Sequence, residues 1–268
     1  MKFFKLFSPL KIGNITIPNR IVMPAMHLHL GENGFVSKRF SDFYIERAKG
    51  GVGLIIIGGC YVDQYAKGFP TMIGLDDDAF IPKLTQFTEE IHKVESDVKI
   101  CAQLYHSGRY TFPIIIGMDP ISPSAEYSRF SKTVPREMTL EDIKREQQAF
   151  ADAAVRAKKA GFDCVEICGN AGYLMGQFLS PLVNKRKDKY GGTFENRVRF
   201  PVETIELIKS YVDDFTVGYR MSGDDFMPNG LTYKDSPPIA KRFEEVGIDY
   251  INVNDRHDSC YQQNWGLA

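Results

Sequence analysis

The sequence predicts an α/β fold, a parallel barrel of about six strand–helix units, from three observations. Short apolar runs rich in β-branched residues alternate with longer segments of helical periodicity, which is typical of a parallel sheet. No G-x-G-x-x-G follows the first strand, and its absence disfavours a dinucleotide-binding Rossmann domain. Long irregular stretches follow the third and fourth strands, and in a barrel such loops lie at the catalytic end.

Each predicted element rests on its own local pattern. The expected strands are residues 20–26, 53–59, 98–105, 163–168, 215–221 and 249–254, and the expected helices are 38–49, 81–94, 140–160, 194–212 and 233–246. Thr139, with Asp142 three residues later, predicts a capping box at the third helix, and Thr193 with Asn196 predicts a cap at the fourth. Residues 1–7 are expected to form a first strand or arm of the domain, because Ser8 and Pro9 interrupt any signal-peptide pattern.

The composition is that of an ordinary globular protein and disfavours several classes of partner. The 268 residues carry a formal net charge of −1 with no basic stripe, so no nucleic acid is expected. The apolar runs are far shorter than the roughly 20 residues that span a bilayer, so no membrane partner is expected. The cysteines at 60, 101, 164, 168 and 260 are odd in number and lack a C-x-x-C pair, which favours free thiols in a reducing cytoplasm.

Five segments, all in the same order, carry a family resemblance. They are LFSPLKIGNITIPNRIVMPAMH near the start, GLIIIGG, QLYHSGRY, the stretch 168–200 with a near-complete NxRxDxYGGxxENRxRF string, and GYRMS. Together they resemble the Old Yellow Enzyme family of NADH:flavin oxidoreductases, in particular the branch of 2,4-dienoyl-CoA reductase and 2-enoate reductase, over residues 6–254. The resemblance implies a (β/α)8 TIM barrel that binds FMN at its C-terminal mouth. It also implies an ene-reductase that uses NAD(P)H to reduce activated C=C bonds of enones or enoyl thioesters.

The resemblance assigns flavin contacts to the ends of the first two strands. Pro24, Ala25 and Met26 match the backbone that meets the flavin ring, His27 matches the position beside its C4 carbonyl, and Gly59 matches a small residue under the ring. From the residues alone, two alternatives stay open. His27 also fits a loop histidine, and Gly59 also fits an ordinary glycine at a barrel mouth.

Two polar residues on later strands match the pyrimidine side of the flavin. Gln103 suits that edge because an amide both donates and accepts hydrogen bonds. Arg220 matches the cation near flavin N1, where a positive charge stabilises the reduced cofactor. The alternative for Arg220 is an ion pair inside the barrel with Glu166.

The catalytic residues implied by the resemblance are Tyr173, as the proton donor to the substrate, and His257, as a later histidine that assists it. Without its motif, Tyr173 would be interpreted as an aromatic residue packed at a strand end. Many relatives have a carbonyl-binding histidine pair before this tyrosine, but Cys168 and Ala171 stand there, as in the dienoyl-CoA reductase branch. His92 and His106 are expected to be ordinary, the first on a polar helix face and the second in the HSGR turn.

The sequence stops after the sixth predicted strand. We therefore expect residues 1–268 to form one FMN-binding barrel domain that is C-terminally truncated and lacks strands seven and eight, which carry the phosphate site in such barrels. A 4Fe–4S centre and FAD are expected only in a longer parent. One alternative is a non-catalytic fragment or subunit unable to hold FMN alone. Another, a lyase or aldolase barrel, would need a Schiff-base lysine or metal-binding carboxylates at the strand ends, and the sequence offers neither.

Overall fold

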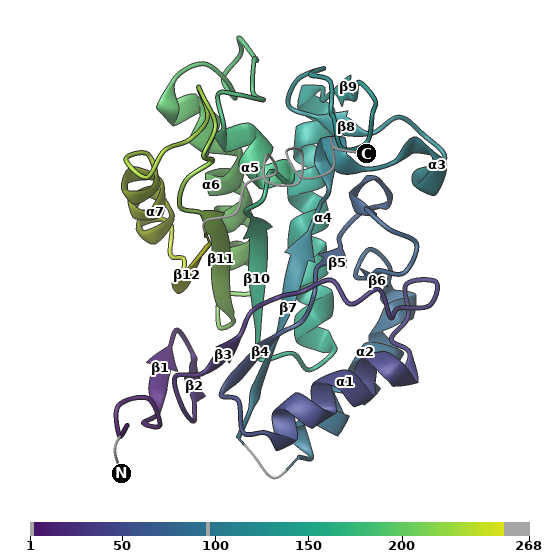
Figure 1. Cartoon of the computed structure of the whole chain (residues 1–268), viewed down its shortest axis with the longest axis vertical. Helices are drawn as coiled ribbons and strands as arrows, with labels where there is room; N and C mark the ends of the chain where they lie inside the picture. Colours follow the sequence, from purple (N-terminus) through teal and green to yellow (C-terminus); the bar gives the residue numbers. More distant parts are fainter. Residues whose placement is uncertain (1–2, 95–96, 255–268) are drawn as a thin grey trace, which may run out of the picture.

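The computed structural model describes residues 3–94 and 97–254, and its centre is a curled parallel sheet (Figure 1). The strands are β3 (Val22–Met23), β4 (Leu54–Ile56), β7 (Lys99–Tyr105), β10 (Cys164–Gly169), β11 (Thr216–Ser222) and β12 (Tyr250–Asn254). They pair in the order β3-β4-β7-β10-β11-β12, each parallel to the next. Spatial order therefore follows chain order, as in a barrel wall. The predicted incomplete α/β barrel is confirmed, and β3 and β12 are its edges in the described part.

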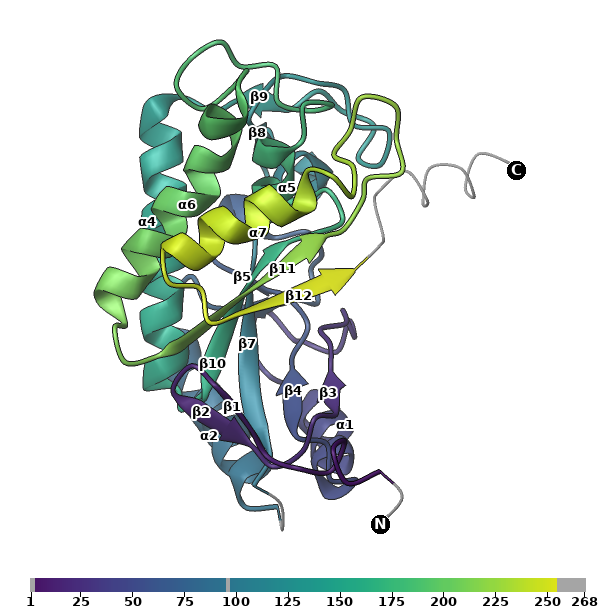
Figure 2. The ribbon, with the colours of Figure 1, turned by 90° about the vertical axis from the view of Figure 1, so that its left-hand side faces the viewer.

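Helices cover the convex face of this sheet (Figure 2). They are α1 (Lys38–Lys49), α2 (Ile81–His92), α4 (Leu140–Lys159), α6 (Phe194–Tyr211) and α7 (Ser236–Glu245). The Thr139 capping box is present in both directions, and the Thr193 hydroxyl accepts the Asn196 N–H. Helix α7 begins at Ser236, later than the predicted residue 233. The reason is that Pro237 and Pro238 have no N–H to donate and fit only in a first turn.

Several short elements lie outside the predicted pattern. They are the strands β1 (Leu10–Ile12), β2 (Ile15–Ile17), β5 (Cys60–Tyr61), β6 (Ile73–Gly74), β8 (Ile121–Ser122) and β9 (Arg136–Glu137), and the helices α3 (Pro113–Ile116) and α5 (Leu174–Leu179). Residues 3–7, expected as part of a first strand or arm, form turns and no strand, and they lead into the β1–β2 hairpin. It is pinned to the start of β11, where Thr216 Oγ1 accepts the Asn14 N–H at 2.9 Å.

The concave side of the sheet changes from apolar to polar along the strands. At the N-terminal ends, next to the hairpin, lies a small apolar cluster that we call the floor: Ile17, Leu54, Ile56, Cys101 and Cys164. Two residues further along β7 and β10, Gln103 pairs in register with Glu166. Because side chains alternate between the two faces of a strand, both lie on the same side as the floor. The interior therefore becomes polar toward the C-terminal mouth.

The main core lies between the sheet and its helices, and it includes Phe87, Phe150 and Phe243. The cysteines at 60, 101, 164 and 168 are free and buried, while Cys260 lies outside the described residues. No helix in the described part is long and apolar enough to cross a membrane.

Candidate active site

A cavity of about 660 Å³ opens at the C-terminal ends of the strands, a size suited to a small molecule. The predicted site residues that line it are Pro24, Ala25, Met26, His27, Gly59, Gln103, Tyr173 and Arg220. They come from the C-terminal ends of four strands, β3, β4, β7 and β11, and from the loop before α5. His257 lies outside the described residues, so the structure does not place it.

The base of the cavity is a buried amide–carboxylate network. Gln103 Nε2 donates to Glu166 Oε1 at 2.7 Å, and Asn252 Nδ2 donates to Glu166 Oε2 at 2.9 Å. Burial raises the pKa of Glu166, while these two hydrogen bonds and the charge of Arg220 act in the opposite direction. Both carboxylate oxygens are thus held by amides, which fixes the orientation of the Gln103 side chain toward the cavity.

Arg220 is tied to the first strand and not to Glu166. Its Nη1 donates to the Ala25 carbonyl at 2.9 Å, and its buried Nε has no hydrogen-bond partner among the described residues. No ion pair joins Arg220 to Glu166 within that part of the chain. The sequence-based alternative of an interior ion pair is therefore wrong, and Arg220 keeps a buried donor at the wall of the cavity.

His27 is an imidazole that stays neutral at ordinary pH. Burial lowers its pKa to about 4, helped by the neighbouring His29 and by the charge of Arg220. Its ring meets Tyr105 edge-on, with 5.0 Å between ring centroids. A neutral ring presents one donor and one acceptor, so His27 suits a ligand edge that carries both.

Close packing explains why two glycines, Gly58 and Gly59, follow β4. A Cβ on Gly58 would lie 2.2 Å from the Met26 carbonyl oxygen, and a Cβ on Gly59 would lie 2.8 Å from the Tyr105 side chain. Gly59 also lines the cavity. Its small size thus serves the packing of Tyr105, and it also leaves room above the strand end.

Tyr173 is placed by a strained turn. It is the residue before α5, and it follows Ala171 and Gly172, whose φ angles are 53° and 74°. A left-handed Ala is costly, and such strain is typically found at functional sites. The Tyr173 ring packs edge-on against Tyr105, with centroids 4.5 Å apart.

An aromatic wall beside Tyr173 was missed by the sequence analysis. Its members are Phe69, Tyr105, Tyr110 and Phe130, and His29 joins them. Tyr105 lies two residues after Gln103, so strand alternation could have identified it. Phe69 and Phe130 come from irregular segments, where no periodic pattern indicates which side chains face a cavity.

Like Ala171, His29 is a cavity residue whose backbone is left-handed, with φ of 54°. Its Nδ1 lies 3.1 Å from Thr71 Oγ1, and its ring meets Phe69 at 4.7 Å. Cys168 and Asn170 also face the cavity, where they hydrogen-bond each other at 3.3 Å. Cys168 and Ala171, which stand where many relatives have a histidine pair, both line the cavity.

The chemistry of the cavity fits a flat heterocycle with a polar edge. Three residues on its wall carry a buried polar atom with no partner among the described residues: Tyr110 Oη, Arg220 Nε and Asn254 Oδ1. Buried polar atoms are normally satisfied, so unpartnered ones on a cavity wall indicate a ligand. Gln103 adds a fixed amide to the same cavity.

A curled parallel sheet with such a cavity at its C-terminal mouth defines the class of α/β-barrel enzymes. Within that class, the chain belongs to the NADH:flavin oxidoreductase / NADH oxidase family, whose model matches residues 5–259. It is 45% identical over 256 residues to an NADH oxidase of Thermoanaerobacter brockii, covering 94% of this chain and 39% of that protein. It is 41% identical over 252 residues to an NADPH dehydrogenase of a Geobacillus species, covering 93% and 72%.

Solved structures agree with the fold and with the resemblance to the Old Yellow Enzyme family. A 2-naphthoyl-CoA reductase in complex with 2-naphthoyl-CoA superimposes with a TM-score of 0.88 at 33% identity, covering 94% of this chain and 41% of that one. An Old Yellow Enzyme homologue from Zymomonas mobilis gives 0.85 at 28% identity, covering 93% and 73%. The chain thus spans less than half the length of some relatives and nearly three-quarters of others.

Proposed function

We propose that this chain is an FMN-binding unit of an NAD(P)H-dependent oxidoreductase that reduces activated C=C bonds in α,β-unsaturated carbonyl or acyl-CoA compounds. The observation that carries the proposal is the convergence of Gln103, Arg220, His27 and Tyr173 on one cavity. Membership of the NADH:flavin oxidoreductase family supports the redox chemistry. In this proposal residues 1–268 act as a single domain.

Bound FMN would supply hydride transfer, which amino-acid side chains do not provide. Gln103 and Arg220 would hold its polar edge, because they offer a fixed amide and a buried guanidinium N–H. His27 would contribute a neutral donor and acceptor, and Pro24, Ala25, Met26 and Gly59 would contribute close backbone contact.

Tyr173 is proposed as the general acid that gives a proton to the substrate, with His257 as its assistant. A tyrosine hydroxyl at the wall of the cavity can do this if substrate binds within hydrogen-bond reach. The substrate class is supported by the likeness to a reductase bound to 2-naphthoyl-CoA. Relatives named NADH oxidase and NADPH dehydrogenase support a nicotinamide reductant without choosing between the two.

A second candidate is a barrel fragment that cannot hold FMN by itself. It is favoured by the short span relative to the Thermoanaerobacter relative, 39% of its length. It is also favoured by exposed apolar side chains on the two edge strands, Val22 on β3 and Val253 on β12. Within the described residues β3 and β12 are the sheet edges, and an edge strand is a template for pairing with further chain.

The deciding experiment is the visible absorption spectrum of the purified chain after incubation with excess FMN and desalting. We expect a retained flavin band that NADH or NADPH bleaches without oxygen and that an enone then restores. The Arg220→Gln variant should retain less flavin, and Arg39→Gln, at an exposed position, should retain as much as the parent. A colourless parent would favour the fragment hypothesis. A flavin that neither nucleotide bleaches would contradict the reductase.

A further inference from the structure

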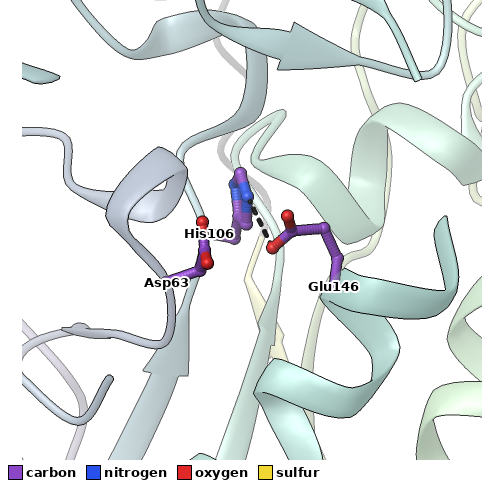
Figure 3. Close-up of side chains that lie close together, drawn as sticks. All are labelled: Asp63, His106 and Glu146. Carbon is purple, nitrogen blue, oxygen red and sulfur yellow. Dashed lines mark ion pairs between the residues drawn. The ribbon is translucent and has the colours of Figure 1, made fainter. Parts of the chain in front are cut away.

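A cluster of three titratable side chains, Asp63, His106 and Glu146, lies behind the cavity wall (Figure 3). His106 follows Tyr105, and its Nε2 lies 3.2 Å from Oε2 of Glu146 on α4; both side chains are fully buried. Asp63 approaches the same imidazole, and the polar atoms of the three residues lie within 4.8 Å of one another. The expectation of an ordinary turn histidine is thus wrong for His106.

Local hydrogen bonds decide where the proton of His106 resides. The Gly108 N–H donates to Nδ1 at 2.9 Å, so Nδ1 carries a lone pair and the ring proton sits on Nε2, facing Glu146. A metal ion on Nε2 would place a proton on Nδ1, directly against the Gly108 N–H. The hydrogen bond from Gly108 therefore favours an Nε2–H beside the Glu146 side chain over a metal ion on Nε2.

Glu146 is held from its other side by an arginine. Arg145 donates to Oε1 through Nε at 3.0 Å and Nη2 at 2.7 Å. Neither His106 Nε2 nor Glu146 Oε2 meets the geometry of a hydrogen bond to any described residue. Their electrostatic contact at 3.2 Å therefore offsets part of the cost of burying these two polar atoms. Removing the charge of Glu146 would leave the imidazole N–H buried without this partner.

The turn that carries His106 also holds the helix that follows Tyr173. The His106 carbonyl accepts the N–H of Leu174, the first residue of α5, at 3.0 Å. The buried Gln177 on the same helix donates to the Ser107 carbonyl at 3.1 Å and to the Gly172 carbonyl at 2.7 Å. Tyr173 is thus fixed on both sides by hydrogen bonds that depend on the 106–109 turn.

We propose that Glu146 and His106 form a positioning pair for Tyr173. Glu146 fixes the imidazole, the imidazole accepts the Gly108 N–H and shapes the turn, and the turn sets the start of α5. The inference rests on the proposed function, in which Tyr173 protonates the substrate. Neither residue lines the cavity, so their effect is exerted through the position of the tyrosine.

The test compares Glu146→Gln with Glu141→Gln, the same change at an exposed position of the same helix. Two half-reactions are followed in the flavin-loaded protein, bleaching by NADH and reoxidation by an enone. We expect Glu146→Gln to slow enone reoxidation about tenfold and to leave bleaching unchanged, because a small displacement of a catalytic group is costly only in its own step. Glu146→Asp, which keeps the charge, should recover part of the rate.

Amide hydrogen exchange gives a readout that does not depend on activity. In Glu146→Gln, exchange should accelerate in the segments 106–109 and 172–177 and stay unchanged in α1 and α2, whereas general destabilisation would accelerate it throughout. Unchanged exchange at α5, equal slowing of both half-reactions, or a divalent ion retained by the parent and lost in Glu146→Gln would each overturn the positioning pair. A parent that no enone reoxidises would overturn the proposed function instead, and the exchange result would still decide on the pair.

Discussion

The two ends of the same strands differ in chemical character: the N-terminal end is apolar and tightly packed, and the C-terminal end is polar. At the floor, Leu54, Ile56, Cys101 and Cys164 pack with Ile17 of the hairpin, and all five are buried. At the mouth, three buried polar atoms lack partners among the described residues, and His29 and Ala171 adopt left-handed backbone conformations. The floor contributes stability, while the mouth keeps groups that are unfavourable without a ligand.

The change from apolar to polar side chains takes place along one pair of neighbouring strands, β7 and β10. Cys101 is paired with Cys164, and two residues later Gln103 is paired with Glu166. Another two residues along β10, Cys168 is paired with Arg220 of β11, and both residues line the cavity. A change at the floor should therefore affect folding, and a change at the mouth should affect chemistry.

The largest expected effect is at the mouth. Replacing Tyr173 with Phe removes the proposed proton donor and keeps the ring that packs on Tyr105. Enone reoxidation of the reduced flavin should slow by about a thousandfold, within the range for loss of a general acid. Stopped-flow absorbance measures this rate. NADH-driven bleaching should not change, and an undiminished enone rate would exclude Tyr173 as the acid.

The next effect is at the floor. Leu54→Ala would leave a cavity among Ile17, Ile56 and Cys164, and it should lower the free energy of unfolding by about 3 kcal/mol. Denaturant titration measures this loss. Leu140→Ala, at an exposed position, is the control and should cost far less. If Leu54→Ala slowed enone reoxidation while unfolding at the parent's denaturant concentration, the division between floor and mouth would be wrong.

The smallest effect is the pH dependence contributed by His27. Its folded pKa of about 4 lies below the ordinary value of 6.5, so the unfolded chain binds the extra proton first as pH falls. Stability should fall between pH 6.5 and pH 4 by about 2 kcal/mol, allowing for the partial exposure of the ring. His27→Gln should lose this share of the slope in denaturant titrations at several pH values. Parallel curves for the two proteins would show that His27 does not stay neutral in the fold.

The sequence by itself determined the wall of the barrel and the residues at its mouth. Periodicity placed the strands and helices, and Thr139 and Thr193 marked helix starts because capping is local. The family motifs identified Gln103, Arg220 and Tyr173, which the structure brings to one cavity. These features depend on short spans of chain, so they can be recognised without a tertiary structure.

Only the tertiary structure decided the contacts between distant segments. Glu146 faces His106 across 40 positions of sequence, Phe69 and Phe130 meet at one cavity from separate loops, and Arg220 reaches the Ala25 carbonyl. None of these pairings leaves a periodic or local signal, because each depends on how the strands curl and which loops fold over them. The fold class and the family follow from local pattern, whereas the support of Tyr173 follows from packing.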